Sequence, residues 1–163
     1  MKAICLLQPW ATLMAIGAKR IETRSWATAY RGSLVIVASR KWTREQEDLL
    51  IRFCASIPHG SQLGNECEHL PGSARRRGYL ALPLGKALCQ IELVDCVRIK
   101  PEGIMSIHNA DPLRYNDEEE FGDFSDGRYA WLTSWTHRFA NPFDVRGRLG
   151  LFGIDDELVR AAG

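Results

Sequence analysis

Four side chains near the N-terminus combine the chemistry that a nucleic-acid site needs. Lys19 and Arg24 are cations that can neutralise phosphate, and Trp26 offers a flat face on which a base can stack. Glu22, between the two cations, can accept a hydrogen bond from a base amino group. The cluster also has a structural interpretation, because Lys19 and Glu22 can form an ion pair beside a helix end, worth roughly 0 to 1 kcal/mol at a surface.

One helix and two strands are predicted to position these residues. Residues 2–7 form a short strand, and residues 8–17 form an amphipathic helix that starts with Gln-Pro-Trp and ends at a glycine. Residues 21–26 form a second strand, in which alternation places Glu22 and Arg24 on one face. The cluster therefore begins at the helix exit and continues along a strand.

The rest of the pattern predicts a barrel. Residues 33–39 are a nearly unbroken β-branched run, typical of a strand buried on both faces, and residues 43–57 form a helix that opens with a capping box. A bulge is expected near Glu92, and the chain after the last strand is expected to fray. Further strands are expected at residues 86–100, 128–138 and 148–154. Together these elements indicate an α+β fold, a mixed, partly open β-barrel of about five to six strands with helices packed on its outside.

Length and composition favour one domain over residues 1–163, with a long irregular insertion at about 58–86. Apolar residues make up 45% of the chain and charged residues 25%, as is typical of soluble globular proteins. No apolar run approaches the roughly 20 residues that span a bilayer, so a cytoplasmic protein with no membrane partner is expected. The net charge of +1 means that nucleic-acid binding must depend on local charge.

No metal and no other cofactor is expected. The five cysteines lack paired spacing, which indicates reduced thiols. His59, Cys67 and His69 can be drawn as a metal site, but they lack a fourth ligand and the tight pairs typical of structural zinc.

Several motifs occur in an order typical of one family. They are Gln-Pro-Trp at 8–10, Gly-Ala-Lys-Arg-Ile-Glu-Thr-Arg-Ser-Trp at 17–26 and Arg-Gly at 31–32, followed by similar strands at 89–96 and 141–152. This pattern resembles the ASCH domain, a relative of the PUA domains, in the form found in a transcriptional coactivator and in small bacterial proteins. The resemblance implies a PUA-like barrel with a positively lined cleft beside the first helix. Its expected partner is RNA, single-stranded nucleic acid or a modified nucleoside.

A binding module is the favoured interpretation. Its predicted nucleic-acid contacts are Lys19, Arg24, Ser25, Trp26, Arg31, Ser39 and Arg40. The alternative is a small metal-independent hydrolase, because bacterial branches of the family resemble an amidohydrolase for acetylated cytidine and a ribonuclease. In that case Lys19, Glu22 and Glu92 would be catalytic, although Glu22 stands where the amidohydrolase branch has a nucleophilic threonine. A third possibility is a protein-interaction adaptor, but no residues in the sequence indicate a peptide-binding groove. The sequence also leaves the oligomeric state open.

Some residues near the predicted site have structural interpretations. Trp10 is expected in the core, and at least one of Trp131 and Trp135 is expected to be buried. Arg31, before a glycine, can equally serve turn formation. The acidic run at residues 117–120 is expected to be a solvated loop.

Overall fold

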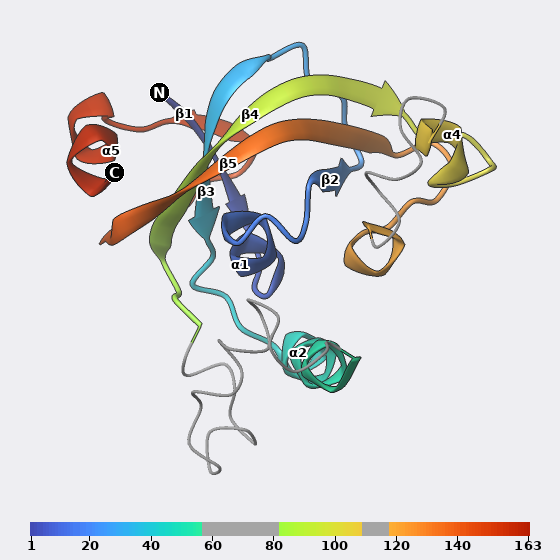
Figure 1. Ribbon diagram of the computed structural model, residues 1–163, viewed down its shortest axis with the longest axis horizontal. Coiled ribbons are helices and arrows are strands. Elements are labelled where there is room, and N and C mark those ends of the chain that lie inside the picture. Colours follow the sequence, from blue (N-terminus) through green and yellow to red (C-terminus); the bar gives the residue numbers. More distant parts are fainter. Residues whose placement is uncertain (57–81, 109–117) are drawn as a thin grey trace.

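The strands of this computed structural model, which describes residues 1–56, 82–108 and 118–163, form a curled, open half-barrel (Figure 1). Their order is β2-β5-β4-β3-β1-β6, with β1 and β3 parallel and the other pairs antiparallel. The strands are β1 (Lys2–Leu6), β2 (Ile21–Arg24), β3 (Gly32–Ala38), β4 (Lys86–Arg98), β5 (Tyr129–Asp144) and β6 (Leu151–Gly153). The helical elements are α1 (Trp10–Ala15), α2 (Arg44–Ser56), α4 (Met105–His108), η3 (Glu118–Phe121) and α5 (Asp156–Ala162). The predicted fold is confirmed.

The strand β3 is buried on both faces, as its β-branched sequence predicts. Leu34 and Ile36 point into one apolar cluster, which α1 completes with Met14, while Val35 and Val37 point into another. Figure 1 shows α1 under the arch that β4 and β5 form. The first cluster therefore holds α1 against the sheet, beside the strands that carry the predicted site.

The chain after β6 does not fray but forms α5, so the prediction of a loose tail is wrong. Asp155 caps this helix by accepting a hydrogen bond from the Glu157 backbone N–H. Val159 and Ala162, three residues apart, bury against the outer face of the sheet beside Phe139. Two apolar residues at helical spacing are only a weak sequence signal for a helix. The helix becomes recognisable once β5 provides the apolar surface on which these residues pack.

The two long strands β4 and β5 pair with irregular register. A register shift occurs between Ile91 and Leu93, which confirms the expected bulge near Glu92. The strand β5 continues past the predicted end at residue 138, because Phe143 and Asp144 still pair with the start of β4. The Asn-Pro pair at 141–142, usually a turn signal, therefore lies within a strand near its end.

The turn into α1 is fixed by the glutamine of the Gln-Pro-Trp motif. The side chain of Gln8 is fully buried, and its Oε1 accepts a hydrogen bond from the Thr12 backbone N–H at 3.1 Å. Its Nε2 donates to the Pro83 carbonyl at 2.8 Å, and the bond to Pro9 is cis. Gly17, at φ +75°, ends the helix as predicted. The motif is thus part of the scaffold of the site.

Most of the predicted insertion at 58–86 lies outside the described residues, as do His59, Cys67 and His69. Within the part of the chain that the structure describes, no helix has the length and apolar character needed to cross a membrane. The same residues contain no group of three potential metal ligands.

Candidate nucleic-acid interface

Lys19 lies in the protein interior, with only 1% of the residue exposed. Its ammonium donates hydrogen bonds to the carbonyls of Ile21 and Phe121, the latter at 2.7 Å, and lies 3.5 Å from a Glu22 carboxylate oxygen. The lysine thus ties the exit of α1 to β2 and η3. These contacts match the structural interpretation of the Lys19–Glu22 pair, and a contact between Lys19 and phosphate stays a prediction.

Glu118 is a second buried charge, and the sequence did not point to it. Its residue is 1% exposed, so the prediction of a solvated acidic run is wrong at this position. The carboxylate accepts hydrogen bonds from the backbone N–H groups of Arg20 and Ile21. Burial raises the pKa of the Glu118 carboxyl, while Lys19 and these two N–H groups oppose the rise. We call Lys19, Arg20, Glu22 and Glu118 the Lys19 cluster.

Glu22 and Arg24 share one face of β2, as alternation predicts. The Arg24 Nε lies 3.0 Å from one oxygen of Glu22, whose other oxygen faces Lys19. A terminal nitrogen of the same guanidinium donates to the Cys5 carbonyl at 3.2 Å. Glu22 is thus held between two cations, and Arg24 extends the ionic chain from the interior to the surface.

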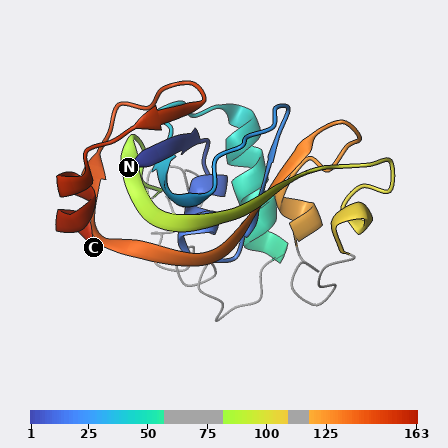
Figure 2. The same cartoon turned by 90° about the horizontal axis from the view of Figure 1, so that it is seen from above.

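A cleft of about 510 Å³ opens beside Arg24, between β1 and the loop before β6. Figure 2 shows this loop beside β1, on the side away from the β4–β5 arch. We call it the basic cleft, because five of its lining side chains are cationic and none of the described lining residues is acidic. The cations are Arg24, Arg40, Lys41, Arg146 and Arg148.

Four residues predicted from the sequence line the basic cleft: Arg24, Trp26, Ser39 and Arg40. Three further cations, at positions 41, 146 and 148, were missed. The Arg-Gly-Arg-Leu-Gly segment that carries two of them was visible in the sequence, but it served only as a mark of the closing strand. Its chemistry becomes clear only when β6 pairs with β1 and brings the segment to the cleft.

Trp26 forms a fixed wall of the basic cleft. Its ring meets that of the buried Trp131 edge to face, with centroids 4.7 Å apart and an interplanar angle of 89°. The indole N–H of Trp131 donates to the Trp26 carbonyl at 3.4 Å. Trp26 remains 36% exposed, so part of its ring is available for stacking. Trp135 is 43% exposed and Trp131 1%, which confirms that at least one of that pair is buried.

A second cleft, of about 400 Å³, shares Cys5, Leu6, Leu7 and Arg24 with the basic cleft, and we call it the inner cleft. Its lining mixes charges, with Glu22, Glu120 and Asp123 opposing Arg24 and Arg128. Trp10 contributes a partly buried ring that packs against Leu13, so it belongs to a small core cluster and also faces the cleft. Burial raises the pKa of the Cys5 thiol, despite a hydrogen bond with Ser39 and the charge of Arg24, so the protonated thiol prevails at neutral pH.

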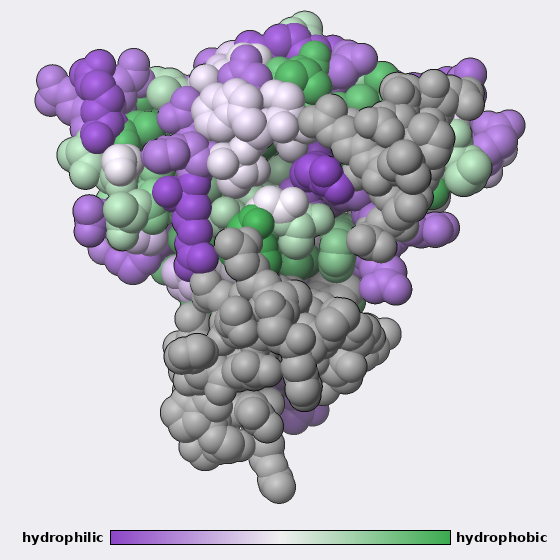
Figure 3. All heavy atoms as spheres, in the orientation of Figure 1, coloured by the Kyte–Doolittle hydropathy of each residue, from purple (hydrophilic) through white to green (hydrophobic). Residues whose placement is uncertain are grey.

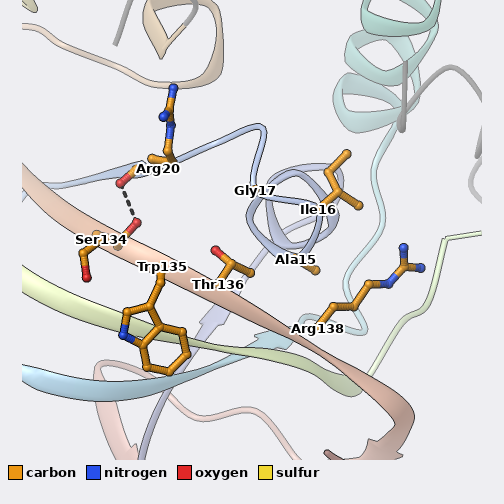
Figure 4. Close-up of a pocket in the computed structure, with 9 residues that line it drawn as sticks. Ala15, Ile16, Gly17, Arg20, Ser134, Trp135, Thr136 and Arg138 are labelled. Atoms are coloured by element: carbon orange, nitrogen blue, oxygen red, sulfur yellow. Dashed lines mark hydrogen bonds between the residues drawn. The ribbon is translucent and has the colours of Figure 1, made fainter. Parts of the chain in front are cut away.

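A groove of about 380 Å³ lies between the end of α1 and β5 (Figure 4). Arg20 and Arg138 lie at its opposite ends, and the Thr133 hydroxyl donates to the Arg20 carbonyl at 2.8 Å. Figure 3 shows that, on the side presented in Figure 1, strongly hydrophilic residues lie both at the periphery and within the face, beside paler and hydrophobic ones. With two separated cations, this groove offers less positive charge than the basic cleft.

The family model of the ASCH domain matches residues 4–143 of this chain. The chain belongs to the ASCH domain family. Activating signal cointegrator 1 from Mus musculus and from Homo sapiens is in each case 24% identical over 158 residues, which cover 95% of this chain. The chain spans only 22% of the length of these two relatives.

Solved structures share the fold of this ASCH domain. The crystal structure of ASCH from Zymomonas mobilis matches with a TM-score of 0.52 at 13% identity, covering 98% of this chain and 90% of that one. A mutant of the same bacterial protein gives a TM-score of 0.53 at 11% identity, covering 98% and 94%. The resemblance predicted from the motifs is thereby confirmed, together with the PUA-like fold.

The remaining predicted residues of this ASCH domain lie outside the basic cleft. Arg31 pairs with Asp95 of β4 at 2.7 Å and donates to the nearby carbonyls of Thr28 and Tyr30, so a contact between Arg31 and nucleic acid stays a prediction. A hydrogen bond from the Cys96 backbone N–H and the Arg31 contact hold the pKa of the Asp95 carboxyl below its usual value. Ser25 is exposed and is not among the residues that line the cleft.

The three residues predicted to be catalytic are brought together only in part. Lys19 and Glu22 are in contact, whereas Glu92 lies on β4 and accepts a hydrogen bond from the Ser33 hydroxyl of β3 at 3.2 Å. Among the described residues, Glu92 lines neither the basic nor the inner cleft.

Proposed function

We propose that this ASCH domain binds RNA or single-stranded nucleic acid in the basic cleft. The observation that supports it is the concentration of five cationic side chains, with no acidic partner in the described lining, on a protein of net charge +1. Such local charge attracts a phosphate backbone and releases its counterions. Trp26 and the hydroxyl of Ser39 lie in the same cleft and supply stacking and hydrogen bonding.

The inner cleft supports a more specific arrangement, in which one base leaves the strand and enters it. The two clefts share a wall at Arg24, so a phosphate held by Arg24 stands at the entrance of both. Inside, Glu22 and Asp123 can accept hydrogen bonds from base amino groups, and Trp10 offers part of an aromatic ring. This arrangement suits a modified nucleoside as well as an unmodified base.

A small hydrolase is the second candidate, favoured by Glu22. Its carboxylate lies in the inner cleft between Lys19 and Arg24, where it could activate water while Arg24 stabilises negative charge. Because Glu92 lies elsewhere, the catalytic set would be Glu22 and Arg24 with Lys19 as support.

Binding is tested with the double variant Arg146→Ala/Arg148→Ala and a fluorescent single-stranded oligouridylate. We expect at least a roughly tenfold loss of affinity at low salt, and a salt slope smaller by about 0.7 for each phosphate contact removed. The matched control is Arg98→Ala/Arg160→Ala, which removes two exposed arginines outside the clefts. Both double variants should retain the thermal stability of the wild type, because exposed substitutions change it little.

Equal affinities in wild type and cleft variant, with no salt dependence, would exclude binding in the basic cleft. The wild type is also incubated with single-stranded RNA and, separately, with acetylated cytidine, and the mixtures are analysed for cleaved RNA and for deacetylated cytidine. Products that disappear with a Glu22→Gln variant that keeps the thermal stability and RNA affinity of the wild type would establish the hydrolase, whereas retention of RNA without products supports the binding module.

A further inference from the structure

The loop at residues 145–150, between β5 and β6, presents an apolar side chain at the mouth of the basic cleft. Leu149 is 101% exposed, whereas the other large exposed hydrophobic residues of the described chain lie between 36% and 62%. Its neighbours Arg146 and Arg148 line the same cleft. A fully exposed leucine therefore directly follows Arg148 and lines the same cleft as the two arginines.

This loop is held against the body of the protein at several points. A Cβ at position 147 would lie 2.6 Å from the Cys5 sulfur, so only a glycine permits this approach to β1. The Val145 backbone N–H donates to the Gly85 carbonyl at 2.9 Å, and Gly150 takes a left-handed turn at φ +67°. Leu149 is therefore presented from an anchored loop.

The chemistry of the cleft mouth distinguishes a single strand from a duplex. The arginines attract phosphate in either case, but a base of a single strand exposes an apolar face that can pack on the leucine. In a duplex that face is covered by the neighbouring base pair, and an apolar side chain can reach it only by opening a base step at an energetic cost. Trp26, which lines the same cleft, offers a second surface for the same strand.

We propose that Leu149 acts as a wedge that packs on an unstacked base and makes the basic cleft selective for single-stranded over double-stranded RNA. This inference rests on the proposed function and specifies its ligand. The wedge orients bases, while the cations bind phosphate.

The test compares the dissociation constants of a single-stranded RNA and of the same RNA paired with its complement. For the wild type we expect the single strand to bind at least roughly tenfold more tightly, and in Leu149→Ala we expect this ratio to fall by roughly threefold or more. Leu158→Ala is the matched control, because Leu158 is a half-exposed leucine on α5, and it should leave the ratio unchanged.

A second readout follows the base itself. In 2-aminopurine-labelled oligoadenylate, wild type at saturation should raise the fluorescence by unstacking the probe, Leu149→Ala should give a smaller rise, and Arg148→Ala should weaken binding but keep the rise at saturation. If Leu149→Ala keeps both the affinity ratio and the fluorescence rise, or if the wild type binds duplex equally well, the wedge is wrong while RNA binding stands. If the wild type binds neither RNA, the proposed function itself fails.

Discussion

The Lys19 cluster and the basic cleft use the same residue types for opposite purposes. Both begin in the segment 19–26, yet Lys19 is 1% exposed with its ammonium against carbonyls and a carboxylate, whereas the described lining of the cleft contains five cations and no acidic residue. In the cluster each charge is compensated within the protein. In the cleft Arg24 is paired with Glu22, but no acidic residue is found among the described lining residues to compensate the other four cations. A positive residue in the motif is therefore a better candidate for nucleic-acid contact when it reaches the surface, as Arg24 does, than when it is buried among internal partners, as Lys19 is.

Glu22 and Arg24 form the boundary between the two regions. Glu22 contacts Lys19 on the inside and Arg24 on the outside, and Arg24 lines both clefts. A change at either residue is expected to affect both folding and binding. Sharper tests of the comparison therefore use residues that belong to one region only.

The largest effect is expected for Lys19→Met. Removing the ammonium leaves two carbonyls without their donor, takes one of two cations from Glu22 and removes a positive charge that stabilises the buried Glu118 carboxylate. The free energy of unfolding should fall by about 3 to 5 kcal/mol. Urea denaturation measures this loss, and Lys41→Met in the basic cleft, as the control, should stay within about 0.5 kcal/mol of wild type. If Lys19→Met keeps its stability but loses RNA affinity, Lys19 belongs to the binding site as the sequence suggested.

An intermediate effect is expected for the contribution of Glu118 to the pH dependence of folding stability. Because the folded-state pKa of Glu118 is raised, its contribution to stability is fully present below the unfolded pKa of about 4.3 and is lost as pH rises through the folded value. Between those two values the native state binds more protons than the unfolded state, so stability falls with rising pH.

The variant Glu118→Gln should therefore not show this fall in stability with rising pH. The difference between the wild type and the variant separates the contribution of Glu118 from those of Asp95 and Asp123, whose lowered pKa values make stability rise with pH. Denaturation at a series of pH values measures the difference, with the exposed Glu119→Gln as control. Parallel profiles of stability against pH for the wild type and Glu118→Gln would contradict a raised pKa of the Glu118 carboxyl in the folded state.

The smallest effect is expected for Arg31→Ala. This arginine forms a surface pair with Asp95, worth roughly 0 to 1 kcal/mol, and lies outside both clefts. We expect RNA affinity to change by less than about twofold, since a rim charge without phosphate contact adds little. A loss comparable to that of the Arg146/Arg148 double variant would extend the interface to Arg31, in agreement with the sequence-based prediction.

Local patterns in the sequence predicted much of the scaffold. The run at 33–39, the glycine after α1 and the bulge near Glu92 are set by near neighbours or by alternation, and all three are confirmed. Part of the cleft could also be found, because Arg24 and Trp26 lie within one family motif.

The missed residues depend on contacts between distant parts of the chain. Glu118 binds backbone groups 97 and 98 positions earlier, and nothing in an acidic run distinguishes it from its exposed neighbours. Arg146 and Arg148 join the cleft only through the pairing of β6 with β1. For Lys19 the motif marks the position but not the direction of the side chain, which contacts the carbonyls of Ile21 and Phe121, and a contact between Lys19 and nucleic acid stays a prediction.

The close contact between Gly147 and Cys5, which depends on the absence of a side chain at position 147, helps to set the width of the basic cleft. One wall, with its two arginines and the leucine, rests on the other where a side chain is missing. A methyl group at position 147 would require the loop or the Cys5 side chain to move. If the loop moved outward, the distance between its arginines and Arg24 would increase. Substitution at this one position could therefore change the width of the basic cleft, to fit a thinner or thicker ligand, without changing the charged residues that line it.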